Sequence, residues 1–115
     1  MRFVNLMRQE IRIIPIDGTP DIVIPSSGLV FINEVNERHT VHDEVYGDIP
    51  VMDVQSQVMN MPDRDEDVAY IVPWKVLQAL RASGYDVSDL YCPDAAVRGE
   101  RGMIIGSRSL LRYTQ

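Results

Sequence analysis

Apolar residues along this chain alternate with polar ones or occur in short blocks, and Pro and Gly separate the blocks. This pattern is typical of β-strands joined by turns, and segments such as Asp17-Gly18-Thr19-Pro20 and Met61-Pro62-Asp63 have suitable turn chemistry. A spacing of about ten residues between strands favours a small sandwich or barrel. The predicted strands are Phe3–Leu6, Ile11–Ile16, Asp21–Ile24, Leu29–Val35, Val41–Tyr46, Ile49–Val54, Val68–Val72 and Met103–Ser107.

One segment, from Pro73 to about Ser83, has helical periodicity. Pro73 has φ preset for the first helical position, and Gly84 can adopt the left-handed conformation that ends a helix. Three apolar residues then form one stripe, which we expect to pack over a face of the sheet. These residues are Val76, Leu77 and Leu80.

The segment after this helix, Tyr85–Gly102, has few apolar residues in register and contains Pro93 and Gly99. We interpret it as a long connecting loop, of a length that is often functional in a compact domain. Together the elements predict an α+β fold. It consists of a mostly antiparallel curved sheet, either a sandwich or a partly open barrel, with one amphipathic helix packed across it.

Length and composition indicate one globular domain, residues 1–115. The chain is 45% hydrophobic and 24% charged, which is typical of a folded protein rather than a disordered one. A single cysteine, Cys92, excludes an internal disulfide and suits a reducing compartment. The sequence shows no signal peptide and no apolar run of membrane-spanning length, so we expect a cytoplasmic protein.

The charge is unevenly distributed and adds a functional expectation. From Glu34 to Asp67 there are ten acids and two bases, a net charge of −8, whereas the rest of the chain has a net charge of +2. Such a segment repels nucleic acid and membrane phosphates and attracts basic protein surfaces. The expected interaction residues are Asp43, Glu44 and Asp48 in a hairpin and Asp63, Asp65, Glu66 and Asp67 in a turn.

Two metal sites can be considered. His39 and His42 lie near Glu34, Glu37, Asp43 and Glu44, but in a strand the two imidazoles would point to opposite faces. The run from Asp63 to Asp67 could offer oxygens to calcium, but it lacks the spacing of an EF-hand and contains Arg64. We therefore predict no metal and no cofactor.

Catalytic and phosphate-binding motifs are equally weak. Cys92 would need His39 or His42 as a base, and we expect a structural thiol instead. Neither Ser26-Ser27-Gly28 nor Gly102–Gly106 has the Gly-Lys-Ser/Thr ending of a phosphate loop, so we predict no catalytic residue.

Four arginines near the C-terminus form either a solvated face or a contact with a second copy. A homo-oligomer is therefore one of the two expectations. They are Arg98, Arg101, Arg108 and Arg112.

Several short motifs also resemble a broad group of small uncharacterised proteins of bacteriophages, prophages and bacteria, whose members open with Phe-Val-Asn-Leu followed by Thr-Pro-His. This chain has Met7-Arg8-Gln9 in place of Thr-Pro-His. The resemblance implies a phage-like context and no particular reaction. The matching segments are Phe3-Val4-Asn5-Leu6, Val23–Gly28, Ile49-Pro50-Val51, Met61-Pro62, Tyr70-Ile71-Val72 and Gly102–Leu110.

These observations favour a non-enzymatic phage or prophage protein that inhibits a host defence or nucleic-acid-binding protein, as an anti-CRISPR protein does. Its acidic surface would bind a basic surface of the host protein or nucleoprotein complex, with no direct contact to nucleic acid or membrane. One alternative is a protein that binds or sequesters a nucleotide signal through the C-terminal arginines. A second alternative is a small enzyme that uses Cys92 or a His/carboxylate site.

Overall fold

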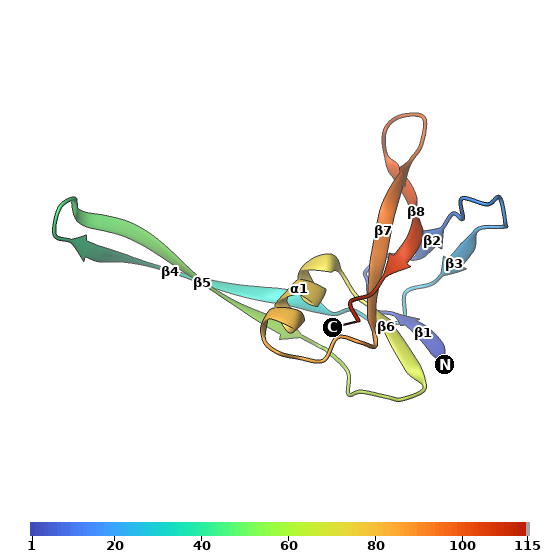
Figure 1. The fold of residues 1–115 in the computed structure, drawn as a ribbon, viewed down its shortest axis with the longest axis horizontal. Coiled ribbons are helices and arrows are strands. Elements are labelled where there is room, and N and C mark those ends of the chain that lie inside the picture. Colours follow the sequence, from blue (N-terminus) through green and yellow to red (C-terminus); the bar gives the residue numbers. More distant parts are fainter. Residues whose placement is uncertain (115) are drawn as a thin grey trace.

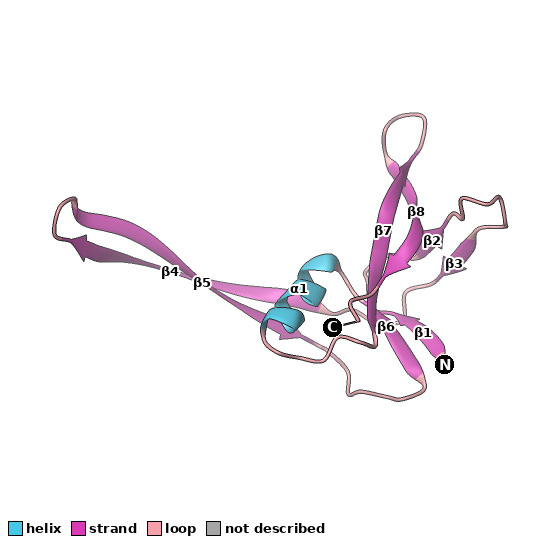
Figure 2. Ribbon diagram, in the orientation of Figure 1, coloured by secondary structure: helices cyan, strands magenta, loops and turns pink. Residues whose placement is uncertain are grey.

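The computed structural model describes residues 1–114 and contains eight strands and one helix (Figures 1 and 2). The helix α1 spans Trp74–Ala82. The strands are β1 (Arg2–Asn5), β2 (Ile11–Ile13), β3 (Ile22–Ile24), β4 (Phe31–Asp43), β5 (Gly47–Met59), β6 (Val68–Ile71), β7 (Leu90–Arg98) and β8 (Ile104–Leu111).

Six strands form the main sheet in the order β1-β6-β7-β8-β2-β3, and β4 and β5 form a separate two-stranded sheet. The neighbours β1, β6 and β7 run parallel, and α1 connects β6 to β7 as the crossover that a parallel pair requires. Most paired residues nevertheless lie in antiparallel ladders, because the β4–β5 and β7–β8 hairpins are long. The α+β fold predicted from the sequence is confirmed.

The main core lies between α1, the central strands and the base of the β4–β5 hairpin. Val76, Leu77 and Leu80 are buried, so the predicted helical stripe does face the core. On the opposite side of the sheet, Ile71 packs with Ile11 and Ile13 in a smaller cluster. Strand β6 is therefore buried on both faces. This explains why Val68–Ile71 has no alternating polar residues.

The ends of α1 follow the predicted signals with one shift. Pro73 is the N-cap in an extended conformation, with ψ of 150°, rather than the first helical residue. At the other end Gly84 has φ of +85°, and the N–H groups of Gly84 and Tyr85 donate to the carbonyls of Arg81 and Leu80. This is a Schellman motif, which satisfies the last helical carbonyls and ends the helix.

Two predictions about the strands are wrong. The segment Tyr85–Gly102 is not one loop, because it contains β7, which pairs with β6 on one side and β8 on the other. Likewise, the predicted break between Leu29–Val35 and Val41–Tyr46 does not exist, because β4 continues through the polar residues 36–40. In both cases pairing with a neighbouring strand outweighs local sequence preference.

The β4–β5 hairpin extends away from the rest of the molecule, as Figure 1 shows. The radius of gyration is 18.6 Å, with extents of 62 × 39 × 25 Å. A compact chain of this length has a radius of gyration of about 13 Å. The excess reflects the extended hairpin, which we call the arm and define as residues 31–59. Among residues 1–114, no helix is long and apolar enough to cross a membrane.

Asn5, in the N-terminal motif, holds three segments together. Its side chain is fully buried and donates to the carbonyls of Gln9 at 3.0 Å and Ile24 at 3.1 Å, while its Oδ1 accepts the N–H of Met7 at 2.8 Å. The amide thereby ties the end of β1 to the following turn and to β3. The asparagine of the Phe-Val-Asn-Leu motif thus has a structural role in this fold.

We expect Asn5→Ala to lower the free energy of unfolding by about 2 kcal/mol or more, because it leaves three backbone groups without their partner. Urea denaturation monitored by circular dichroism measures this. Asn5→Asp is the informative comparison, since it keeps an acceptor for Met7 but places a carboxylate against two carbonyls. An Asn5→Asp variant as stable as the wild type would show that the two donated bonds contribute nothing.

Candidate functional site

The tip of the arm is a tight turn that presents two apolar side chains to solvent. The Oδ2 atom of Asp43 accepts the N–H groups of Val45 and Tyr46, each at 3.1 Å, and Gly47 has φ of +80°. Hairpins with a three-residue loop use this left-handed position to restore strand pairing. As a result Val45 and Tyr46 are 81% and 82% exposed.

The arm is anchored to the body only at its base. There Ile32 and Val58, which are cross-strand partners, pack against the main core. Beyond this pair the ribbon has no third strand, and a two-stranded hairpin alone in water is at best marginally stable. Beyond the Ile32–Val58 pair, the ribbon also exposes apolar side chains on both of its faces and at its tip. They are Val35, Val41, Val45, Tyr46, Ile49, Met52 and Val54.

The arm also carries most of the net charge of the protein. Six acids and one base, Arg38, lie in residues 31–59, giving a net charge of −5 out of −6 for the whole chain. Glu37 lies directly opposite Asp53, an arrangement of like charges that is unfavourable in a ladder. The acids are Glu34, Glu37, Asp43, Glu44, Asp48 and Asp53.

The two histidines lie on this arm, on opposite faces as predicted for a strand. His39 Nε2 is 2.8 Å from Asp53 Oδ2, and His42 Nδ1 is 2.9 Å from Asp48 Oδ1. Each imidazole thus has its own carboxylate partner. Nowhere in residues 1–114 do three His, Cys, Asp or Glu side chains converge as a metal site would require.

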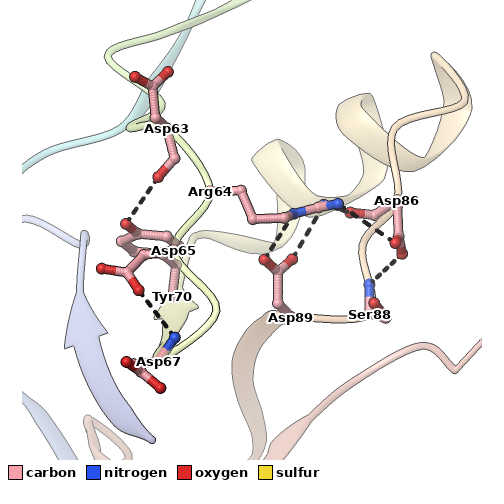
Figure 3. Close-up of polar contacts among 8 residues, drawn as sticks. All are labelled: Asp63, Arg64, Asp65, Asp67, Tyr70, Asp86, Ser88 and Asp89. Atoms are coloured by element: carbon pink, nitrogen blue, oxygen red, sulfur yellow. Dashed lines mark hydrogen bonds and ion pairs between the residues drawn. The ribbon is translucent and has the colours of Figure 1, made fainter.

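The second acidic group, Asp63 to Asp67, forms an exposed loop on the body (Figure 3). Arg64 fixes this loop: its Nε donates to Asp89 Oδ2 at 3.0 Å, and its guanidinium lies 5.1 Å from the ring centroid of Tyr85. Asp65 Oδ1 accepts the N–H of Asp67 at 2.9 Å. The loop is consequently held by the body's own contacts.

The surroundings of this loop shift the pKa of two nearby groups, the Tyr70 hydroxyl and the Asp86 carboxyl. Burial raises the pKa of the Tyr70 hydroxyl, and the nearby carboxylates of Asp65 and Asp89 add to the effect. The same hydroxyl donates to the carbonyl of Asp63 at 3.1 Å. The N–H of Ser88 donates to Asp86, and this bond lowers the pKa of the Asp86 carboxyl. The bond from Tyr70 to Asp63 joins the loop to β6, and Asp86 in turn pairs with Arg64 of the loop at 3.5 Å.

The structure does not bring the two predicted acidic groups together. Asp43, Glu44 and Asp48 lie at the far end of the arm, whereas residues 63–67 lie on the body beside β6 (Figure 1). The acidic segment of the sequence therefore forms two separate surfaces. The arm combines negative charge with exposed apolar side chains along its length.

The residues of the two alternative sites are also separated. Cys92 is 1% exposed in β7, and burial raises the pKa of its thiol. Both histidines lie on the arm, so no Cys–His dyad forms within residues 1–114.

In the described part of the chain, the C-terminal arginines do not form the other alternative site, a nucleotide site. Arg98 donates to the Gly102 carbonyl and Arg108 to the Ile14 carbonyl. They point to different backbone groups instead of lining a common anion site.

One pocket, of about 300 Å³, does contain two arginines, Arg64 and Arg112. Arg112 donates to the hydroxyl of Tyr91 at 3.2 Å, and Arg64 is already paired with carboxylates. Four acids line the same pocket, so it does not have the chemistry of a nucleotide phosphate site. These acids are Asp65, Glu66, Asp86 and Asp89.

The sequence predicts the charges of the arm but not the arm itself. Part of the sequence signal for a hairpin is present, because Asp43 and Gly47 have the turn chemistry of a hairpin that joins two long segments of equal length.

Comparison of the chain with models of protein families, with curated proteins and with solved structures gives no match.

Proposed function

We propose that the protein is a non-enzymatic binding protein that acts in the cytoplasm and docks its arm on a basic surface of a partner protein. The observation that carries this proposal is the unsupported ribbon, which has thirteen cross-strand pairs, a net charge of −5 and exposed apolar residues along its length. Apolar side chains supply contact area, and carboxylates guide the approach to a basic partner.

The shape of the arm suggests the kind of basic surface. A narrow ribbon with carboxylates on both faces is complementary to a positively charged groove, and proteins use such grooves to hold nucleic acid. We therefore propose a host nucleic-acid-binding or defence protein as the partner, with inhibition as the result, as in anti-CRISPR proteins. The sequence resemblance to phage and bacterial proteins adds the phage setting to this proposal.

Neutralising the arm should slow association with the partner, which can be isolated from an extract of the native host with the immobilised protein. We expect the variant Glu37→Gln, Glu44→Gln, Asp48→Asn and Asp53→Asn to lower the association rate at least about tenfold, because steering by charge depends on these groups. The rate of the wild type should also fall as salt rises, and that of the variant should fall less. Biolayer interferometry at several salt concentrations measures both effects.

The matched control removes four charges from the loop on the body: Asp63→Asn, Asp65→Asn, Glu66→Gln and Asp67→Asn. We expect this variant to have a smaller effect, because its charges lie away from the arm. If the loop variant slows association and the arm variant does not, the binding surface lies on the body instead.

A further inference from the structure

An apolar groove lies at the base of the arm, between the start of β4, the first turn of α1 and the turn after β1. Its volume is about 510 Å³. Leu29 and Phe31 are partly exposed on its wall, so part of this apolar surface is in contact with water. The apolar lining consists of Met7, Leu29, Val30, Phe31, Ile32, Pro73 and Val76.

The charged residues around this groove are mostly basic. Arg8 and Lys75 line it together with one acid, Glu34. Within the described residues neither Arg8 nor Lys75 forms an ion pair. The groove therefore suits an occupant with an apolar centre and negative charges around it.

The tip of the arm has this composition. Val45 and Tyr46 are its exposed apolar centre, and Asp43, Glu44 and Asp48 surround them. The tip cannot reach the groove of its own chain, because strands of thirteen residues hold it about 40 Å from the base of the arm. The matching surfaces can only meet between two copies.

We propose that the arm tip of one copy docks in the arm-base groove of a second copy. The contact joins two different surfaces, so two such contacts related by a two-fold axis give a closed dimer. This inference goes beyond the proposed function, since it requires no outside partner. Where both hold, self-association covers the tip, and the partner must compete with a second copy for it.

The test uses the purified chain alone, so its failure is distinguishable from a failure to bind an outside partner. For the wild type, we expect light scattering after size-exclusion chromatography to give the mass of a dimer rather than that of a monomer. Tyr46→Ser should raise the dissociation constant at least about tenfold, because buried tyrosines dominate many interfaces. Met103→Ser is the matched control, since it removes an apolar residue that is 68% exposed from the end of the β7–β8 hairpin.

Charge reversal tests the pairing of the two surfaces directly. Lys75→Glu places a carboxylate against the acidic tip, and Glu44→Lys lowers the net charge of the tip from −3 to −1, so we expect each variant to associate more weakly than the wild type. A mixture of the two should associate more tightly than either variant alone, because the introduced lysine and the introduced glutamate then face each other. The proposal is overturned if the wild type is monomeric, if Met103→Ser and not Tyr46→Ser disrupts the assembly, or if the mixture associates no more tightly than either variant alone.

Discussion

The Leu77→Ala variant is expected to lose about 2–5 kcal/mol of unfolding free energy, the usual cost of removing a fully buried leucine side chain. Leu77 has no exposed surface and lies in the cluster that joins α1 to β6, β7 and the base of the arm. The substitution leaves a cavity where α1, β6, β7 and the base of the arm meet. Urea denaturation monitored by fluorescence of Trp74 or by circular dichroism measures the change.

Lys75→Ala is the control for this prediction, because Lys75 is an exposed residue of the same helix. Its effect on the free energy of unfolding should be within about 0.5 kcal/mol. A loss of less than about 1 kcal/mol for Leu77→Ala would contradict the burial of the helical stripe. It would also weaken the anchoring of the arm, since Ile32 and Val58 pack on the same cluster.

Shortening the arm should greatly weaken partner binding while leaving the body folded. Deleting residues 37–40 and 50–53 removes four complete cross-strand pairs, beginning with Glu37 opposite Asp53. An even number of pairs preserves the alternation of faces, so Asn36 and Val54 join correctly to Val41 and Ile49. The turn and the base remain intact, and only the exposed middle of the ribbon is lost.

We expect this variant to unfold at nearly the same urea concentration as the wild type, because the deleted side chains contribute nothing to the core. Its affinity for the partner should fall by at least about a hundredfold if the ribbon supplies the central contact area. The loop variant at residues 63–67 provides the matched control. Full binding by the shortened chain would place the interaction on the tip or the body.

The parts of the fold that the sequence predicts well are those determined by local signals. Pro73 and Gly84 mark the helix, and Val76, Leu77 and Leu80 show which side faces the core. Short apolar blocks also locate β1, β2, β3 and β6 to within a few residues. In these segments the burial pattern and the local conformational preference indicate the same element, so a single sequence is enough to predict it.

Strand β7 could not be predicted in this way. Pro93 cannot donate to a ladder and normally argues against a central strand, yet here it lies opposite Leu110 in the β7–β8 pairing. Leu90 and Cys92 are buried, but two residues are too few to reveal an alternating pattern. The position of β7 between β6 and β8 depends on contacts that are distant in the sequence.

The candidate site shows a similar division. The sequence reveals the excess of carboxylates and the separation of His39 and His42 to opposite faces of a strand. It does not reveal that the acids form two groups, because the polar residues 36–40 resemble a loop, which conceals the length of β4. Only the pairing of β4 with β5 turns this stretch into a ribbon that projects from the body.

In this proposal the ribbon of the arm, rather than its tip or the body, supplies the contact with the partner, and comparative affinities decide between these surfaces. The partner captured from the host extract by the wild-type chain is purified, and its affinity is measured by biolayer interferometry for the wild type, the shortened-arm variant and the loop variant. A contact on the ribbon predicts tight binding by the wild type and the loop variant and binding at least about a hundredfold weaker by the shortened-arm variant. Equal binding by the wild type and the shortened-arm variant would contradict it.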